Sequence, residues 1–187
     1  MSGEWVFVLT TSDRGAAGEK DDASGAAVAA RLIGLGFKVR RDVVADDRAT
    51  IESVLRSAAT DHSLVVTTGG TGLTPRDVTP QATLAVVDYE VPGLAEAMRA
   101  EGRRHTPMAD LSRAVVGVLG RTLIVNLPGS PKGAMESLEA IIPVIDHALE
   151  TLAGPFDHRS TAPDTAAPSP EPEARDPRVV AFPDEHE

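Results

Sequence analysis

The sequence contains no cysteine among its 187 residues. This absence excludes a disulfide framework, an iron–sulfur cluster and a cysteine nucleophile, and it fits a protein of a reducing cytoplasm. No apolar run approaches the roughly 20 residues that span a bilayer. Glu4 stands before only a short apolar run, so we expect neither a membrane span nor a signal peptide. Aromatic residues make up 3% of the chain, so a core must consist mainly of Val, Leu, Ile and Ala.

Basic residues are few: 18 Lys and Arg stand against 28 Asp and Glu, for a net charge of -10. An acidic chain without a basic cluster is a poor ligand for nucleic-acid phosphates, so we expect no nucleic-acid partner. The acidic excess is unevenly spread, since residues 154–187 contain eight acidic and three basic residues and seven of the 14 prolines. We expect a folded domain over residues 1–153 and a disordered, acidic, proline-rich tail over residues 154–187.

Strand-like and helix-like segments alternate through residues 1–153, as is typical of an α/β fold with a mostly parallel sheet. Apolar runs predict strands at 5–10, 37–44, 64–68, 114–119 and 122–127. Helices are predicted at 24–35, from 46 or 47 to about 58, from 79 onward, at 92–104 and at 131–152. Thr79 is expected to cap the helix that begins at Pro80. Pro143 lies inside the last helix and is expected to kink or divide it.

The most specific local pattern is T-T-G-G-T-G-L-T-P-R-D-V-T-P at residues 67–80. Gly69, Gly70 and Gly72 follow a predicted strand at its carboxyl end, where ligands bind in α/β sheets. Glycines let the backbone approach a ligand and direct several N–H groups at an anion such as phosphate. The residues that follow fit neither a P-loop nor a dinucleotide fingerprint. The alternative interpretation is a glycine turn that only reverses the chain.

Two aspartates are predicted at the same edge of the sheet. Asp77 follows the glycine motif, and Asp46 follows the second predicted strand. Carboxylates beside a phosphate site usually hold a hard cation such as Mg²⁺. The structural alternatives are a helix cap for Asp46 and a turn residue for Asp77, and Asp47 competes with Asp46 for either role.

Two more predicted strands end in small polar residues. The pattern N-L-P-G-S-P at 126–131 places Gly129 and Ser130 just before a helix, a position that favours anions. Its alternative interpretation is a Pro-Gly turn with a serine cap. Ser12 and Asp13 follow the first strand in the same way. The five histidines show no metal-ligand spacing, and there is no G-x-S-x-G motif of a serine hydrolase.

The motif at 67–80, L-S-R at 111–113 and N-L-P-G-S-P at 126–131 together resemble the MogA/MoaB family. These proteins are the molybdopterin adenylyltransferases of molybdenum-cofactor biosynthesis, related to the G domain of gephyrin-type proteins. The resemblance covers about residues 4–153 in order, and the tail has no counterpart in the family. It implies a three-layer α/β/α sandwich that assembles as a homotrimer, or as a hexamer of two trimers.

The resemblance also implies a cytoplasmic nucleotidyltransferase that uses Mg²⁺ and ATP. AMP is joined to the terminal phosphate of molybdopterin, pyrophosphate leaves, and the product passes to the molybdenum insertase. The alternative is a family member that binds molybdopterin without adenylylating it.

Family members use two aspartates for this reaction, which correspond here to Asp46 and Asp77 as catalytic Mg²⁺ ligands. The family commonly has Pro-Asp-Glu at the first position, whereas this chain has Ala45-Asp46-Asp47. The remaining expected contacts are to phosphate or to the pterin, at Ser12, Asp13, Gly69, Gly70, Thr71, Gly72, Ser112, Gly129 and Ser130.

Overall fold

The computed structural model describes residues 4–154, and the expected tail lies outside this range except for Gly154. Six strands form one sheet in the order β2-β1-β3-β6-β5-β4. The strands are β1 (Trp5–Thr11), β2 (Lys38–Val44), β3 (Leu64–Thr68), β4 (Tyr89–Glu90), β5 (Val116–Leu119) and β6 (Thr122–Leu127). The helices are α1 (Asp13–Ala16), α2 (Ala23–Gly34), α3 (Arg48–Ala58), α4 (Thr79–Leu84), α5 (Pro92–Arg103), the 3-10 helix η1 (Pro107–Leu111) and α6 (Pro131–Ala153).

Four neighbouring strands run in the same direction. β1 pairs in parallel with β2 and β3, and β3 pairs in parallel with β6, whereas β5 is antiparallel to both β4 and β6. The register aligns Thr10 with Thr68 and Thr68 with Leu127, so these strands end level with one another. The loops that follow β1, β2, β3 and β6 therefore meet at one edge of the sheet.

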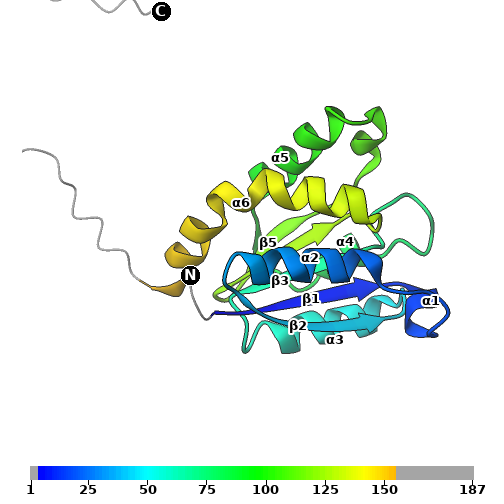
Figure 1. The fold of residues 1–187 in the computed structure, drawn as a ribbon. Helices are drawn as coiled ribbons and strands as arrows, with labels where there is room; N and C mark the ends of the chain where they lie inside the picture. Colours follow the sequence, from blue (N-terminus) through cyan, green and yellow to red (C-terminus); the bar gives the residue numbers. More distant parts are fainter. Residues whose placement is uncertain (1–3, 155–187) are drawn as a thin grey trace, which may run out of the picture. The chain divides into compact units, whose positions relative to one another are not determined.

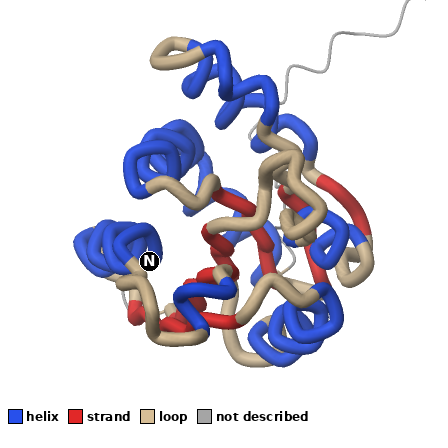
Figure 2. The backbone as a smooth tube through the Cα atoms, turned by 90° about the vertical axis from the view of Figure 1, so that its right-hand side faces the viewer, coloured by secondary structure: helices blue, strands red, loops and turns tan. Residues whose placement is uncertain are grey.

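Helices cover both faces of the sheet, so the fold has three layers (Figure 1). On one face, Val28 and Leu32 of α2, Met98 of α5 and Leu138 of α6 join the larger core cluster. On the other face, Ile51 and Leu55 of α3 and Ala82 of α4 join the second cluster. Figure 2 shows the strands between these two sets of helices. The predicted α/β/α sandwich with a mostly parallel sheet is confirmed.

Short elements were not predicted, because they lack a periodic apolar pattern. They are α1, β4 and η1, of two to five residues each. The predicted cap at Thr79 is wrong. Val78 is the N-cap of α4, and the Thr79 hydroxyl lies 2.9 Å from the Thr11 hydroxyl instead, so this side chain ties α4 to the end of β1.

Pro143 does not divide the last helix. α6 runs unbroken through this proline and is 23 residues long in total. Proline removes one backbone hydrogen bond and clashes with the preceding turn. Burial of an apolar stripe that includes Leu138, Ile141, Ile145 and Leu149 offsets this cost. Within residues 4–154, no helix is long and apolar enough to span a membrane.

Candidate functional site: two cavities that share two loops

Two cavities lie at the carboxyl edge of the sheet. The first, the polar cavity, has a volume of about 240 Å³ and is lined by the ends of β1 and β3 and by loop residues that include Asp46, Gly69, Gly70, Asp77 and Gly129. The second, the apolar cavity, has a volume of about 260 Å³ and is lined by α5, η1, α6 and loop residues that include Thr71, Gly72, Pro128 and Ser130. The loop after β3 and the loop after β6 thus each line both cavities, with different residues facing each cavity.

The loop after β3 adopts a conformation that requires glycine. Gly69 and Gly70 have positive φ angles of 97° and 61°. A Cβ atom on Gly69 would lie 2.4 Å from the carbonyl oxygen of Thr11, and one on Gly70 would lie 2.3 Å from the Thr79 hydroxyl. The glycines therefore allow both the turn and its close approach to β1 and α4.

The backbone N–H groups of this loop are not equivalent. The N–H of Gly69 donates to the carbonyl of Leu127 at 3.2 Å. Among the residues that the structure describes, the N–H groups of Gly70 and Thr71 find no protein acceptor. Two donors at the boundary between the cavities are thus available to an anion, rather than the four of the whole glycine stretch.

Asp77 lines the polar cavity and also closes a turn. Its carboxylate accepts hydrogen bonds from the backbone N–H of Thr74 at 2.8 Å and from the Thr74 hydroxyl at 2.6 Å. Burial raises the pKa of Asp77, but these two bonds and one from the N–H of Gly72 outweigh it, so that the pKa lies below its ordinary value. Asp77 is therefore held ionised in a fixed position. It is a turn residue, and it also lines the polar cavity.

The structure separates Asp46 from Asp47. Asp47 is the N-cap of α3, because its carboxylate accepts from the N–H of Thr50 at 2.8 Å. Asp46 lines the polar cavity, and its carboxylate accepts from the N–H of Asp13 at 3.0 Å. Burial raises the pKa of Asp46, and the negative charges of Asp13 and Asp77 raise it further. A nearby cation would therefore stabilise the ionised form of Asp46.

The donor set fits a magnesium ion that shares its shell with a phosphate. Within residues 4–154, no three His, Cys, Asp or Glu side chains gather as a self-sufficient metal site. Mg²⁺ needs only one or two carboxylates where substrate phosphates and water supply the remaining ligands. Asp46 and Asp77, which line one cavity and interact electrostatically, meet that requirement.

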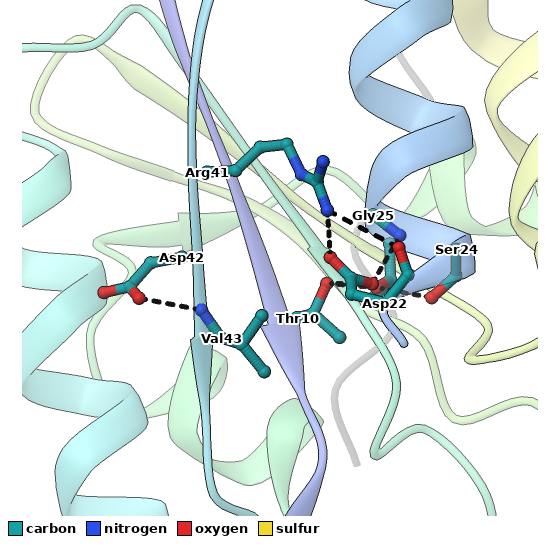
Figure 3. Close-up of polar contacts among 8 residues, drawn as sticks. Thr10, Asp22, Ser24, Gly25, Arg41, Asp42 and Val43 are labelled. Atoms are coloured by element: carbon teal, nitrogen blue, oxygen red, sulfur yellow. Dashed lines mark hydrogen bonds and ion pairs between the residues drawn. The ribbon is translucent and has the colours of Figure 1, made fainter. Parts of the chain in front are cut away.

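The floor of the polar cavity is a buried hydrogen-bond network that the sequence did not reveal. The Thr68 hydroxyl lies 3.1 Å from the hydroxyls of both Thr10 and Ser24. The Asp22 carboxylate accepts hydrogen bonds from the Thr10 hydroxyl at 2.9 Å, the Gly25 N–H at 2.8 Å and the Arg41 guanidinium at 2.6 Å. Figure 3 shows these contacts. Burial raises the pKa of Asp22, but these bonds, led by that from Arg41, lower it below its ordinary value.

Arg113 was another residue without an expected role. Its guanidinium donates to the carbonyls of Gly72 at 2.6 Å and Asp77 at 2.5 Å, and its backbone N–H donates to the carbonyl of Thr71 at 3.0 Å. Arg113 thus fixes the glycine loop where the loop passes between the cavities. The only signal in the sequence was its place in the L-S-R motif.

The other expected site residues divide between the cavities, with one exception. Ser12 lines the polar cavity and caps α1, since its hydroxyl accepts from the N–H of Gly15 at 3.1 Å. Ser112 and Ser130 line the apolar cavity. Asp13 lines neither cavity, and its carboxylate is bound to the Arg76 guanidinium at 2.6 Å. The structure thus brings the expected residues to one edge but not to a single site.

Known proteins match this chain in both sequence and fold. The molybdopterin adenylyltransferase of Helicobacter pylori strain J99 is 39% identical over 156 residues, which are 81% of this chain and 89% of that protein. That of Escherichia coli K12 is 36% identical, over 87% of this chain and 91% of that protein. The crystal structure of the molybdopterin biosynthesis enzyme MoaB from Thermus thermophilus is 53% identical, with a TM-score of 0.76 over 81% of this chain and 98% of that one.

The family model called MoCF_biosynth, described as a probable molybdopterin-binding domain, matches residues 7–147. This range includes both cavities, the glycine loop and the first part of α6. The chain belongs to the MoCF_biosynth family of probable molybdopterin-binding domains.

Proposed function

We propose that this protein is a molybdopterin adenylyltransferase, which transfers AMP from ATP to the terminal phosphate of molybdopterin with Mg²⁺ and releases pyrophosphate. The observation that carries the proposal is the pair of cavities on either side of one glycine loop. A polar cavity with carboxylates and free N–H groups suits a nucleoside triphosphate, and an apolar cavity suits a flat heterocycle. The relatives named molybdopterin adenylyltransferase support both the pathway and this activity.

In the proposed reaction, an oxygen of the molybdopterin phosphate attacks the α-phosphorus of ATP. The new phosphorus–oxygen bond forms as the bond to the bridging oxygen breaks, and pyrophosphate leaves with the electron pair. The attacking phosphate is already ionised near neutral pH, so no strong general base is required. The protein must instead align two anions and offset their charge.

Different residues of the site would bind the phosphates, the magnesium ion and the pterin. The N–H groups of Gly70 and Thr71 would bind phosphate oxygens at the boundary between the cavities. Asp46 and Asp77 would hold the magnesium ion, which supplies charge neutralisation on the transferred phosphate. Ser112 and Ser130 would contact the pterin from the wall of the apolar cavity.

A protein that only binds molybdopterin is the competing function. Such a protein needs the apolar cavity but has no use for two carboxylates in the neighbouring polar cavity. Asp46 in particular favours the enzyme. Burial and the charges of Asp13 and Asp77 raise its pKa in spite of the nearby Arg76, so a bound cation would stabilise its ionised form. We further propose that the chain acts as a homotrimer, or as a hexamer of two trimers, and passes its product to a molybdenum insertase.

The test is to incubate the full chain with molybdopterin and Mg-ATP. We expect adenylylated pterin and pyrophosphate in equal amounts, and no product with an ATP analogue that has a methylene group between the α and β phosphorus atoms. Retention of unmodified molybdopterin in the presence of Mg-ATP would identify a binding protein and contradict the proposal.

A further inference from the structure

One carboxylate lies in the wall of the apolar cavity, where the proposed mechanism gives it no part. Gly133, Glu136 and Ser137 line the cavity from one face of α6, across from Met98 of α5. The Glu136 side chain is only 19% exposed. Among the described residues around this cavity it is the only acidic one. A carboxylate that is largely withdrawn from water in apolar surroundings needs strong partners.

Glu136 lacks such partners in the described part of the chain. Its carboxylate lies 3.6 Å from the Nδ1 atom of His105 and 3.7 Å from the Nζ atom of Lys132, and both distances are beyond hydrogen-bond range. Lys132 is itself 80% exposed, so that pair is weak. The other charged residue of the wall, Arg99, donates to the carbonyl of Ala114 at 3.1 Å. The carboxylate oxygens of Glu136 are therefore available as hydrogen-bond acceptors toward a ligand.

The proposed substrate has the matching donors. A pterin is a 2-amino-4-oxopteridine, whose ring N3–H and 2-amino group lie side by side on one edge. Two adjacent N–H donors suit the two oxygens of a carboxylate in the same way as an arginine fork does. The faces of the ring are apolar and suit the side chains of Met98, Met108 and Pro128, which line the same cavity.

We propose that Glu136 is the specificity-determining residue for the pterin, and that its carboxylate accepts hydrogen bonds from the N3–H and 2-amino groups. This assignment rests on the proposed function and deepens it, because it explains how an otherwise apolar cavity selects a 2-aminopyrimidin-4-one ring. A pteridine with an oxygen at position 2 would direct a carbonyl at the carboxylate and be rejected.

A purely structural role for Glu136 gives a different expectation. His105 follows the end of α5, so its contact with Glu136 joins the α5–η1 segment to α6. If that contact were the purpose of Glu136, removing either partner would have the same consequence. The His105→Gln variant removes the imidazole and leaves the Glu136 carboxylate in the cavity, so it separates the two roles.

The experiment measures the dissociation constants of 6-hydroxymethylpterin and 6-hydroxymethyllumazine, which differ at position 2, for the full wild-type chain and for two variants. We expect the wild type to prefer the pterin by about ten- to a hundredfold. Glu136→Gln, which offers one acceptor and one donor, should reduce the preference to about threefold or less, through weaker pterin binding. His105→Gln should keep the wild-type preference.

Thermal unfolding of each variant controls for loss of the fold. A wild type that binds both compounds equally, a Glu136→Gln variant that keeps the preference, or a His105→Gln variant that loses it would each overturn the assignment. A folded wild type that binds neither compound would contradict the proposed function itself, which is a different result from a change confined to one variant.

Discussion

The polar and apolar cavities are neighbours built from the same two loops, yet their chemistry differs sharply. In the loop after β3, Gly69 and Gly70 line the polar cavity, whereas Thr71 and Gly72 line the apolar one. In the loop after β6, Gly129 lines the polar cavity and Ser130 lines the apolar cavity. One short backbone segment thus fixes the position of one cavity relative to the other. Two substrates bound there would be held in a set geometry, which is how an enzyme converts an encounter into a reaction.

The cavities also differ in how they are supported. The polar cavity has a floor of hydrogen-bonded hydroxyls and the Asp22 carboxylate. The apolar cavity is closed by packed side chains such as Met98 and Ala114, both nearly inaccessible to solvent. Disturbing a charge should therefore affect mainly the polar cavity, whereas disturbing the shared loop should affect both.

The largest effect is expected for Asp77→Asn. An asparagine retains an oxygen that can accept from Thr74, so the turn should persist, but a proposed magnesium ligand and its charge are lost. Adenylyl transfer should fall by about a hundredfold or more, while pterin binding in the apolar cavity stays within about twofold of wild type. Turnover is measured as pyrophosphate release, and pterin binding by equilibrium titration.

The matched control is Asp47→Asn, one residue beyond Asp46. Asp47 caps α3 through the same kind of contact that Asp77 makes with Thr74, but it does not line the polar cavity. Asparagine is as good a helix cap as aspartate, so both stability and turnover should be close to wild type. Undiminished turnover in Asp77→Asn, or an equal loss in both variants, would remove Asp77 from the chemistry.

Arg113→Met should affect both cavities together. The substitution leaves the carbonyls of Gly72 and Asp77 without their charged donor, which destabilises the fold by about 2 kcal/mol. Because the loop loosens at the boundary, we expect the affinities for ATP and for the pterin to fall together, each by about tenfold. Arg121→Met is the control, since Arg121 also donates to a carbonyl, that of Ala153, but lines neither cavity. A loss confined to one ligand would show that the loop does not couple the cavities.

The sequence was sufficient for the fold because the strands have a clear apolar pattern. Runs such as 64–68 are largely apolar, as expected for strands covered on both faces, and every residue of β3 is buried. The glycine motif was equally informative, since its conformation depends on residues adjacent in the sequence. The edge at which the expected site residues gather followed from strand direction alone.

The parts that sequence reasoning missed depend on contacts between distant segments. Arg113 reaches Gly72 across 41 positions, and Arg41 reaches Asp22 across 19. Nor does the pattern Asp46-Asp47 reveal which side chain turns toward α3 and which toward the cavity, because both residues precede the same helix. The division of the expected residues between two cavities was beyond prediction for the same reason.

The smallest effect that tests the comparison is the pH dependence of Arg41→Met. Arg41 pairs with Asp22 at 2.6 Å beneath the polar cavity and helps to hold the pKa of Asp22 below its ordinary value (Figure 3). A carboxyl group with a lowered folded-state pKa contributes stability above its unfolded pKa of about 3.9. That contribution is lost as the pH falls through the folded-state value.

Arg41→Met should therefore unfold at lower urea concentration than wild type, with a difference of about 1 kcal/mol that is constant between about pH 5 and 8. The difference should begin to shrink below about pH 4, where the unfolded chain takes up the Asp22 proton. It should vanish once the pH has fallen through the lowered pKa of Asp22 in the folded wild type. Arg103→Met is the control, because the ion pair of Arg103 with Asp110 at 2.8 Å is about half exposed on both sides and should contribute little. A difference that persists or grows in acid would mean that Arg41 stabilises the fold by packing rather than by its charge, and that the floor of the polar cavity does not depend on this ion pair.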